Sequence, residues 1–467
     1  MKAFAGSLFL IILLSSCKKD SLLTSGDARI TLTADTLKFD TVFTSFGSIT
    51  QSFKIINDND QRLKISGVRL EGGASSNFKI NVDGITGPAA TDLEIAANDS
   101  LYIFASVVID PGTANLPFVI RDSIRIDYNG KQRWVQLEAW GQNAHFLRSH
   151  RVATDETWAN DLPYVILGSL AIDSGRTLTI TKGCKVFVHG DAPVLVNGSL
   201  HVEGEKDSAD RVYFRGDRLD DPYRSFPASW PGLYFSASSD DNLLTYAVIS
   251  NAYQGIAAQG LSPFGPKIKM DECVIDNAYD AGIITLNSSI TATNCLVSNC
   301  GKNLYLLQGG QYSFTHCTVA SFSNTFILHR DPVLLVSDFV NVNNVPQVAP
   351  LSADFTNCIF WGENGTVDDE VIVARNGAAG FAVSFQADLW KIQKNDPSTV
   401  AGVTATQMIN NQNPLFDSVN TLRNIYNFHL QPGSPAIDQG SAGAVSIDLD
   451  GNPRPVGPPD IGCYERQ

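Results

Sequence analysis

Four polar side chains that could carry chemistry recur at regular spacing in the middle of the sequence. They follow one another at intervals of 22, 22 and 41 residues, each directly before a cysteine: Glu272, Asn294, His316 and Asn357. In a strand whose side chains alternate between two faces, they point outward if the cysteines point inward. A carboxylate and an imidazole could exchange protons there, and the amides could hold a polar ligand. Arg330 and Asp331, in a predicted turn, could supplement this stripe.

The stripe is poor in the groups that carbohydrate enzymes require. Glycoside hydrolases use paired carboxylates, whereas this stripe has one carboxylate and one histidine. A solvated polar face explains these residues more simply. The GxSxG, HExxH and Walker patterns do not occur in the sequence, and Cys and His show no nucleophile–base pattern. The sequence therefore predicts no catalytic residue, no metal site and no cofactor.

Composition narrows the classes of partner. The chain has 467 residues, with 34 Lys and Arg against 48 Asp and Glu, and a formal net charge of −14. Nucleic-acid binding requires cations that replace phosphate counterions, so this balance argues against a nucleic-acid partner. The length indicates more than one domain, and 43% hydrophobic residues can form a large core.

The stripe belongs to a sequence repeat with a period of about 22 residues. Its columns are Ala247-Cys273-Cys295-Cys317-Cys358, Ile249-Ile275-Val297-Val319-Phe360 and Ile256-Ile283-Leu304-Phe326. The last interval in the first column, 41 residues, is nearly two periods. Aligned apolar columns indicate a right-handed, single-stranded parallel β-helix with coils about 4.8 Å apart. The chain is thus predicted to be all-β, with the β-helix at residues 150–440.

A column of asparagines marks one corner of the predicted coil. Asn251, Asn277 and Asn299 each lie four residues after a position of the first column. Asparagine tolerates left-handed backbone, and its amide can bond the neighbouring coil. We expect these residues to form a structural turn column.

The chain has eight cysteines, which in an exported protein can indicate disulfides. The four in the first column would face a dry core, where a thiol behaves as a small apolar group. Disulfides or a metal site are the alternatives, but no CxxC occurs. We expect free, buried thiols.

Residues 28–143 have the pattern of a β-sandwich. About seven short alternating segments are separated by turn residues, including the hairpin pair Asn129-Gly130. The segments Leu37–Asp40, Phe53–Asp58 and Val108–Pro111 resemble immunoglobulin-like domains of the abnormal-spindle/hydin type. That resemblance implies a spacing or presenting role.

Residues 1–16 have the layout of an export signal, with Lys2 before a short apolar run at 8–14. Leu14-Ser15-Ser16-Cys17 resembles the lipobox of bacterial lipoproteins. The resemblance implies lipid attachment at Cys17, a tether at 17–27 and a membrane partner reached through the lipid. Lys18 after the cysteine fits export to the outer membrane, and Lys19-Asp20 partly matches the acidic signals for display at the cell surface, where we expect this lipoprotein to be exposed.

The C-terminal region contains three linked motifs, Asn413-Pro-Leu-Phe-Asp417, Phe428-His-Leu-Gln-Pro-Gly-Ser-Pro-Ala-Ile-Asp438 and Pro459-Asp-Ile-Gly-Cys-Tyr-Glu465. Together, over about residues 245–467, they resemble the choice-of-anchor Q domain of bacterial β-helix surface proteins. The resemblance implies architecture and anchoring, without a reaction. We expect the lipid at Cys17, rather than a C-terminal sorting segment, to anchor this chain.

Prolines in the same region cannot extend a β-ladder, so residues 441–467 are predicted to cap the open end of the β-helix. Asp448–Asn452 is predicted to form an Asx-type turn rather than a calcium loop. Its expected polar network comprises Asp438, Asp448, Arg454 and Asp460.

Two function classes remain open. The first is a surface protein that binds a polysaccharide or another macromolecule along the β-helix flank without catalysis. The second is a polysaccharide lyase or glycoside hydrolase, which three or more acids on adjacent coils would favour, and the sequence shows no such cluster. Binding is therefore preferred. Candidate aromatic platforms for sugars are Trp158, Tyr223, Trp230, Tyr253, Tyr279, Trp361 and Trp390.

Two predicted outward columns are mostly apolar, Val274-Leu296-Thr318-Ile359 and Ala257-Ile284-Tyr305-Ile327. Contiguous exposed apolar surface usually marks a contact. We expect residues 362–425, an excursion from the coil, to fold back over the coils near 273–330.

Overall fold

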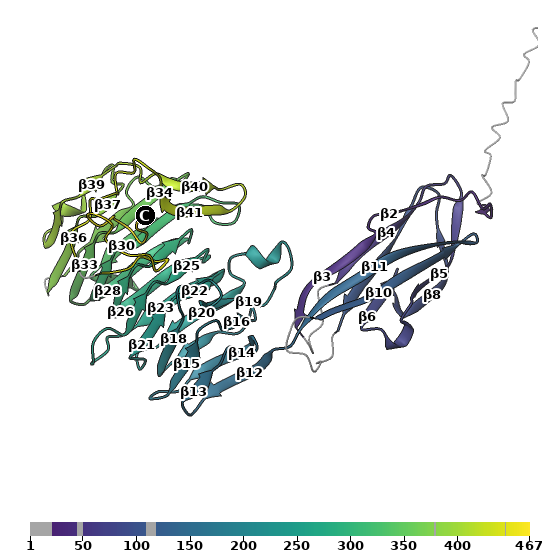
Figure 1. The fold of residues 1–467 in the computed structure, drawn as a ribbon, viewed down its shortest axis with the longest axis horizontal. Coiled ribbons are helices and arrows are strands. Elements are labelled where there is room, and N and C mark those ends of the chain that lie inside the picture. The colour runs from purple at the N-terminus through teal and green to yellow at the C-terminus, as the bar shows by residue number, and fades with distance from the viewer. Residues whose placement is uncertain (1–20, 44–49, 109–117, 378–379, 444) are drawn as a thin grey trace, which may run out of the picture. The chain divides into compact units, whose positions relative to one another are not determined.

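The computed structural model describes residues 21–43, 50–108, 118–377, 380–443 and 445–467 (Figure 1). It divides into two units, Met1–Asn143 and Ala144–Gln467. The predicted export signal at 1–16 and the predicted lipid site Cys17 lie outside the described residues. Within the described ranges, no helix is both long and apolar enough to cross a bilayer.

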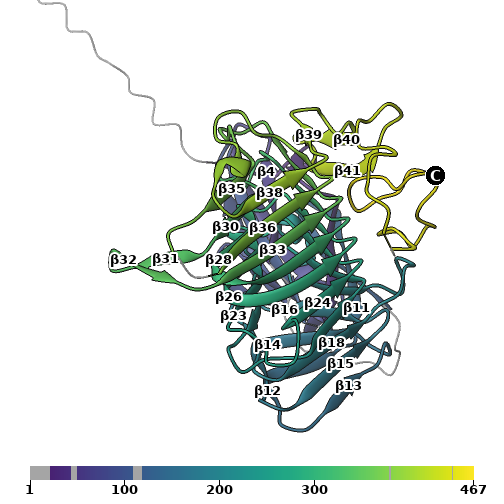
Figure 2. The ribbon, with the colours of Figure 1, turned by 90° about the vertical axis from the view of Figure 1, so that its left-hand side faces the viewer.

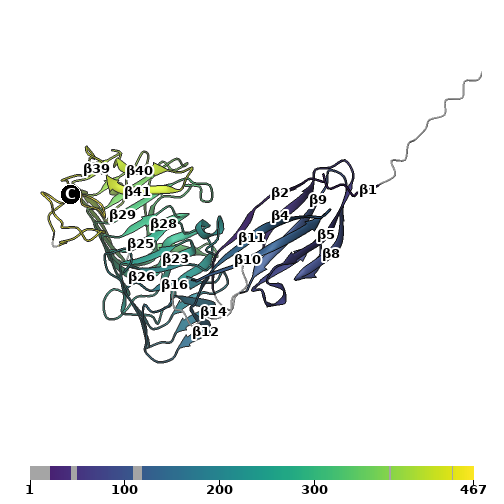
Figure 3. The same ribbon diagram turned by 45° about the vertical axis from the view of Figure 1, so that its right-hand side comes forward.

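The first unit is a β-sandwich of two sheets, as predicted (Figure 3). One sheet comprises β1 (Leu22–Leu23), β3 (Thr36–Phe43), β5 (Arg62–Leu70), β8 (Ala89–Ile95), β10 (Phe118–Tyr128) and β11 (Lys131–Gln142). The other comprises β2 (Ile30–Leu32), β4 (Gln51–Asn57), β6 (Phe78–Val82), β7 (Ile85–Gly87) and β9 (Ser100–Val107). A short 3₁₀ turn, η1 (Gly73–Ser75), follows β5. Because β1 pairs with β5, part of the predicted tether 17–27 belongs to the sandwich.

The second unit is a parallel β-helix, also as predicted, in which 26 strands follow one another along a continuous path. Each coil supplies strands to three faces, named A, B and C in the order of the chain from β15 onward. Parallel pairing joins each strand to its counterpart one coil later. The first strands are β12 (His145–Val152), β13 (Glu156–Trp158) and β14 (Tyr164–Ile172).

The strands group by face. Face A holds β15 (Thr177–Thr181), β18 (Ser199–Glu203), β21 (Asn242–Thr245), β24 (Ile268–Asp271), β33 (Leu351–Thr356), β36 (Phe381–Gln386) and β38 (Val403–Thr406). Face B holds β16 (Lys185–Val188), β19 (Val212–Gly216), β22 (Ala247–Ser250), β25 (Val274–Asp276), β27 (Leu296–Ser298), β29 (Thr318–Phe322), β34 (Ile359–Glu363), β37 (Leu389–Trp390) and β39 (Ile409–Asn410). Face C holds β17 (Val194–Val196), β20 (Trp230–Phe235), β23 (Ala252–Gln259), β30 (Leu334–Ser337) and β35 (Val371–Ala374). The long strands β26 (Ala281–Thr293) and β28 (Lys302–Thr315) pass from face C to face A.

The first two predicted columns lie in the core of the helix, in register from coil to coil. Each buried aliphatic side chain contributes about 1.5–3 kcal/mol by leaving water. Farther along, Phe314, Phe355 and Phe385 stack with ring centroids 5.6 and 4.9 Å apart. The core is therefore built by like positions that repeat along the axis.

The 41-residue interval is one coil, and the prediction of nearly two is wrong. Thr318 pairs directly with Ile359, so no coil lies between them. The extra length is a loop at 323–333 and a hairpin, β31 (Phe339–Val342) with β32 (Val345–Val348), that stands out from the coil (Figure 2). Consequently Leu334, not Phe326, follows Leu304 in the third column.

The prediction for residues 362–425 is wrong for most of the segment, because residues 362–410 continue the β-helix, and it is confirmed only for β40 (Phe416–Asn420), which packs back on face B. β35, β36, β37, β38 and β39 add further coils, and the 3₁₀ turn η3 (Pro397–Thr399) connects two of them. The repeated cysteine could not predict these coils from the sequence, because the next position of that column is Asp388. That buried carboxylate accepts from the Cys358 backbone N–H.

The C-terminal segment covers the flank of the helix rather than its end, which corrects the predicted cap at 441–467. The hairpin β40 (Phe416–Asn420) with β41 (Ile425–Leu430) packs on face B. Later residues follow the corner between faces A and B, where Arg211 donates to the Leu449 carbonyl at 3.0 Å and Gly462 N donates to the Asn357 carbonyl at 2.8 Å. One segment thus spans several coils.

Candidate functional site

The stripe predicted to face a ligand is buried. Glu272 is 7% exposed, and Asn294, His316 and Asn357 are at most 1% exposed. All four have positive φ, between 51° and 58°, at the corner between faces A and B. Strand alternation does not continue through left-handed backbone, so the argument that placed these side chains outward fails. The prediction of an exposed stripe is wrong.

The corner is instead a hydrogen-bonded seam beneath the C-terminal segment. Asn294 Nδ2 donates to Glu272 Oε1 and to the Ile447 carbonyl, both at 2.9 Å. His316 Nδ1 donates to the Asp460 carbonyl at 3.1 Å, and its Nε2 accepts from Asn357 Nδ2 at 3.0 Å. Both imidazole nitrogens are therefore occupied, which leaves no base for a substrate.

Burial shifts the pKa values of two side chains in this seam. It raises the pKa of Glu272 to about 6. Burial, with the charge of Arg454 as a second cause, lowers the pKa of His316 to about 3. His316 is therefore neutral at pH 7, in keeping with the tautomer that its two hydrogen bonds require.

Arg330 and Asp331 lie elsewhere, in the 323–333 loop at the corner between faces B and C. Arg330 is exposed and Asp331 is half-buried. Asp280 is the main cause of the raised pKa of Lys302, and Asp331 adds to it. The structure therefore does not join these two residues to the buried seam.

The asparagine column is confirmed as a turn column. Asn251, Asn277 and Asn299 have φ of 62°, 57° and 51°. Asn277 Nδ2 donates to Asn251 Oδ1 at 2.8 Å, so the amides bond from coil to coil as predicted. Asn299 bonds Asp276 of the preceding coil at 3.2 Å.

The described cysteines are all free and buried: Cys184, Cys273, Cys295, Cys300, Cys317, Cys358 and Cys463. Burial raises the pKa of the Cys463 thiol to about 12, and it raises the pKa of Cys184 as well. Cys463 and Cys184 are therefore core groups rather than nucleophiles.

The Asx-type turn near the C-terminus is confirmed. Asp448 Oδ1 accepts from the N–H groups of Asp450 and Asn452 at 3.0 and 2.8 Å. Beside it, Arg454 and Glu465 form a fully buried ion pair at 3.2 Å. Asp460 Oδ1 accepts from Asp438 N at 2.8 Å, so the four predicted residues belong to one structural region.

The two outward apolar columns differ in whether other residues cover them. The face-B column is covered, since Leu296 and Ile359 pack in a cluster with Phe416, Phe428 and Ile461. Cover was predicted correctly, but only its first strand, which carries Phe416, lies within the predicted segment 362–425, and the rest of the cover follows that segment in the chain. The face-C column stays open along part of its length.

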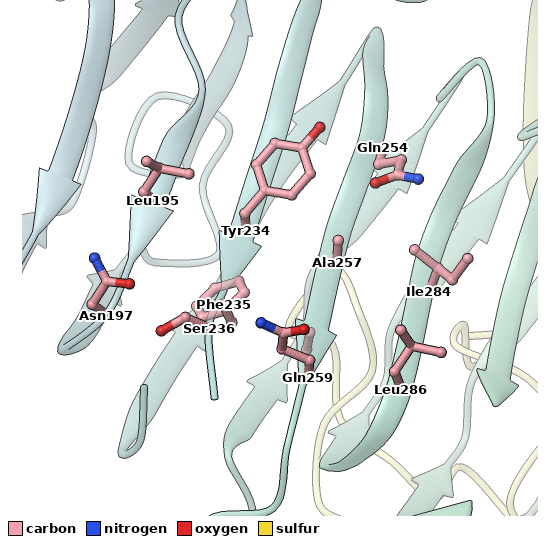
Figure 4. Close-up of a pocket in the computed structure, with 11 residues that line it drawn as sticks. Leu195, Asn197, Tyr234, Phe235, Ser236, Gln254, Ala257, Gln259, Ile284 and Leu286 are labelled. Carbon is pink, nitrogen blue, oxygen red and sulfur yellow. The ribbon is translucent and has the colours of Figure 1, made fainter. Parts of the chain in front are cut away.

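The open column forms the floor of a groove of about 430 Å³ (Figure 4). Leu195 pairs with Tyr234, Tyr234 with Ala257, and Ala257 with Ile284, so the groove crosses β17, β20, β23 and β26. Leu195 is 39% exposed. The remaining lining residues are Asn197, Phe235, Ser236, Gln254, Ala258, Gln259 and Leu286. The floor ends before Tyr305, which is buried, and Leu335 rather than Ile327 comes next in the column.

Two amides in the groove make no side-chain hydrogen bond to the described part of the chain. Neither the Asn197 nor the Gln259 side chain bonds to any residue in the described part of the chain. Gln254 differs, since its Nε2 donates to Asp280 Oδ2 at 2.7 Å. Asp280 in turn bonds Lys302 at 2.8 Å, and these partners lower the pKa of Asp280. The groove therefore combines an apolar floor with fixed and free amides.

An aromatic pair stands beside the groove on the same coils. The rings of Tyr253 and Tyr279 stack with centroids 6.0 Å apart, and they are 45% and 52% exposed. Both were among the predicted sugar platforms, and Tyr223 is also exposed. Burial excludes four others: Trp158, Trp230, Trp361 and Trp390. In the sequence, the outward-facing column that contains Ala257 and Ile284 was the signal that could have identified the groove amides.

A scan of known protein families finds no match to this chain, and a search of curated proteins finds none either. Among solved structures, a family 123 glycoside hydrolase from Clostridium perfringens matches at 13% identity and a TM-score of 0.18, over 25% of this chain and 26% of that one. WR4, an MSP family member from C. elegans, matches at 10% identity and a TM-score of 0.17, over 24% and 96%. The PapD-like domain 7 of human CEP192 matches at 6% identity and 0.17, over 30% and 97%. At these TM-scores the likenesses carry no argument about fold or function.

Proposed function

We propose that this protein is a lipid-anchored cell-envelope protein that holds an uncharged glycan in the face-C groove without catalysing a reaction on it. The observation that carries the proposal is the open apolar column flanked by Asn197 and Gln259, whose amides have no partner in the described chain. Ligand sites typically combine such an apolar surface with a few convergent polar groups.

A sugar ring has matching chemistry. Its C–H face can lie on Tyr234 and the aliphatic floor, while its hydroxyls bond the two free amides. The eleven lining residues include no charged side chain. An uncharged sugar can therefore bind without removing water from a charged group that it could not pair. The exposed Tyr253–Tyr279 pair would extend the platform along the helix axis.

The absence of a carboxylate among the eleven lining residues favours binding over hydrolysis. An inverting or retaining glycosidase places two carboxyl groups across the scissile bond. The acid beside the groove, Asp280, is committed to Gln254 and Lys302. Polysaccharide cleavage is the competing function, and an assay for cleavage products distinguishes it from binding.

Sequence resemblances support the location that we propose. The lipobox-like segment before Cys17 supports lipid anchoring in the outer membrane, and the C-terminal motifs support the surface architecture of choice-of-anchor Q proteins. Along the chain, the sandwich would then separate the lipid anchor from the β-helix.

The test is a glycan array with the chain from residue 21 onward, alongside an assay at about 235 nm for the unsaturated products of lyases. On a glycan that binds, Asn197→Ala and Gln259→Ala should each weaken affinity about fivefold, because each removes a hydrogen bond of about 1 kcal/mol. Gln132→Ala is the matched control, since that exposed amide lies in the sandwich and outside the groove. Formation of product, or equal affinity in all variants, would refute the proposal.

A further inference from the structure

A second groove, of about 380 Å³, lies on face B in the first coils of the β-helix. It has no residue in common with the face-C groove. Its lining residues are Asn160, Gly183, Lys185, Ser208, Ala209, Tyr213 and Arg215. In a chain with a net charge of −14, two of these seven residues are cationic and none is acidic.

The two cations project from neighbouring strands on the same side. Lys185 of β16 pairs with Tyr213 of β19, and Phe187 pairs with Arg215. The alternate residues Val186 and Phe214 are buried in the core, so Lys185 and Arg215 face outward. Strand spacing and a two-residue offset separate their Cα atoms by about 8 Å, which long side chains can close around one small anion.

Neither cation has an acidic partner, although its neighbours do. Lys182 pairs with Glu205 at 3.0 Å, and Arg224 pairs with Asp221 at 2.7 Å. Lys185 and Arg215, by contrast, form no ion pair with any residue of the described ranges. The Arg215 guanidinium lies over the Phe187 ring, 5.0 Å from its centre, and this ring contact does not supply the acceptor oxygens that its N–H groups could bind.

Arg215 is also partly withdrawn from water. Its pKa is lowered, first by burial and second by the charge of Arg224. Glu205, followed by Asp210 and Asp207, raises the pKa of Lys182, whereas no carboxylate contributes to the shift in the pKa of Arg215. A half-buried guanidinium without an ion pair loses part of its hydration free energy without compensation, and a bound anion would supply that compensation.

We propose that the face-B groove binds an oxyanion, namely the carboxylate, sulfate or phosphate group of a ligand. Arg215 would offer the planar fork that matches two oxygens of such a group, and Lys185 would add a point charge. Tyr213 is held at the side of the groove, since its hydroxyl donates to the Ser208 carbonyl at 2.8 Å. The site is independent of the neutral-glycan groove on face C.

Isothermal titration of the chain from residue 21 onward tests this site. The probes are sulfate, phosphate and galacturonate, each at constant ionic strength, with galactose as the uncharged counterpart of galacturonate. We expect saturable binding of at least one anion and none of galactose. Tighter sulfate or phosphate binding would assign a tetrahedral anion, and tighter galacturonate binding would assign a sugar carboxylate.

Matched variants identify the residues. Arg215→Gln should raise the Kd at least tenfold and Lys185→Gln severalfold, whereas Lys182→Gln, with the same change of charge in a paired lysine, should change it less than twofold. If Arg215→Gln does not fold, the Kd of the Lys185→Gln variant tests the site instead, because Lys185 is exposed. The absence of saturable binding by every anion, or an equal loss in Lys182→Gln, would overturn the proposal. The face-C variants should bind the anion normally, so failure here is distinguishable from failure of the glycan proposal.

Discussion

The neutral state of His316 should make the C-terminal seam sensitive to acid. The unfolded chain has a histidine pKa near 6.5, whereas burial lowers the pKa of folded His316 to about 3. The stabilising contribution is therefore complete above pH 6.5 and is lost as pH falls toward 3, because only the unfolded state takes up the proton over that range. His316→Gln removes this proton-linked loss while keeping a side chain that can donate and accept.

The magnitude follows from the two pKa values. Over the whole window the loss amounts to about 5 kcal/mol, and between pH 7 and pH 5 it is about 2 kcal/mol. Glu272 acts with the opposite sign: its pKa of about 6 in the folded state lies above 4.5. Its stabilising contribution is present below pH 4.5 and is lost as pH rises through 6. That effect is common to wild type and variant, so it cancels when the two are compared.

The assay is urea unfolding of the β-helix unit at pH 7 and pH 5, followed by tryptophan fluorescence. His316→Gln should lose about 2 kcal/mol less between the two pH values than the wild type does. A constant penalty of the substitution does not affect this difference. His145→Gln is the control, since that half-exposed ring lies on the first strand of the unit and outside the seam. Equal pH-dependent losses in wild type and His316→Gln would refute the assigned ionisation.

Three further outcomes are expected. Cys17→Ser should abolish lipid labelling and membrane retention, and a variant that stays membrane-bound beside an unlabelled wild type would contradict the anchor. Denatured, unreduced protein should show most of its seven non-lipid thiols to a thiol reagent, whereas the folded protein should react slowly because those thiols are buried; fewer than three would mean that disulfides form. Asn277→Ala should lower the unfolding free energy by about 1–2 kcal/mol, since it loses the bond to Asn251 and places a Cβ in left-handed backbone without a compensating amide. Asn277→Gly should cost less, and equal losses would show that backbone strain is unimportant.

The sequence repeat was sufficient to predict the interior of the β-helix. Cys273, Cys295 and Cys317 occupy successive equivalent positions, and parallel pairing brings residues about one period apart into contact. Inner columns must then be apolar, and a left-handed corner favours asparagine. Such local requirements recur at every coil, so the repeat alone places Asn251, Asn277 and Asn299 at a corner.

Tertiary structure decided what covers the outside of the coil. Asn294 looked like a surface residue because strict alternation put it outward, but a left-handed corner turned it beneath a carbonyl 153 residues farther along the chain. No period in the sequence encodes the path of the C-terminal segment, which is set by packing of residues such as Phe416 and Ile461 against face B. The same packing leaves the other apolar column uncovered. The sequence by itself therefore determined the core and its corners, whereas only the folded chain determined which apolar column stayed uncovered, because cover depends on contacts between segments that share no repeat.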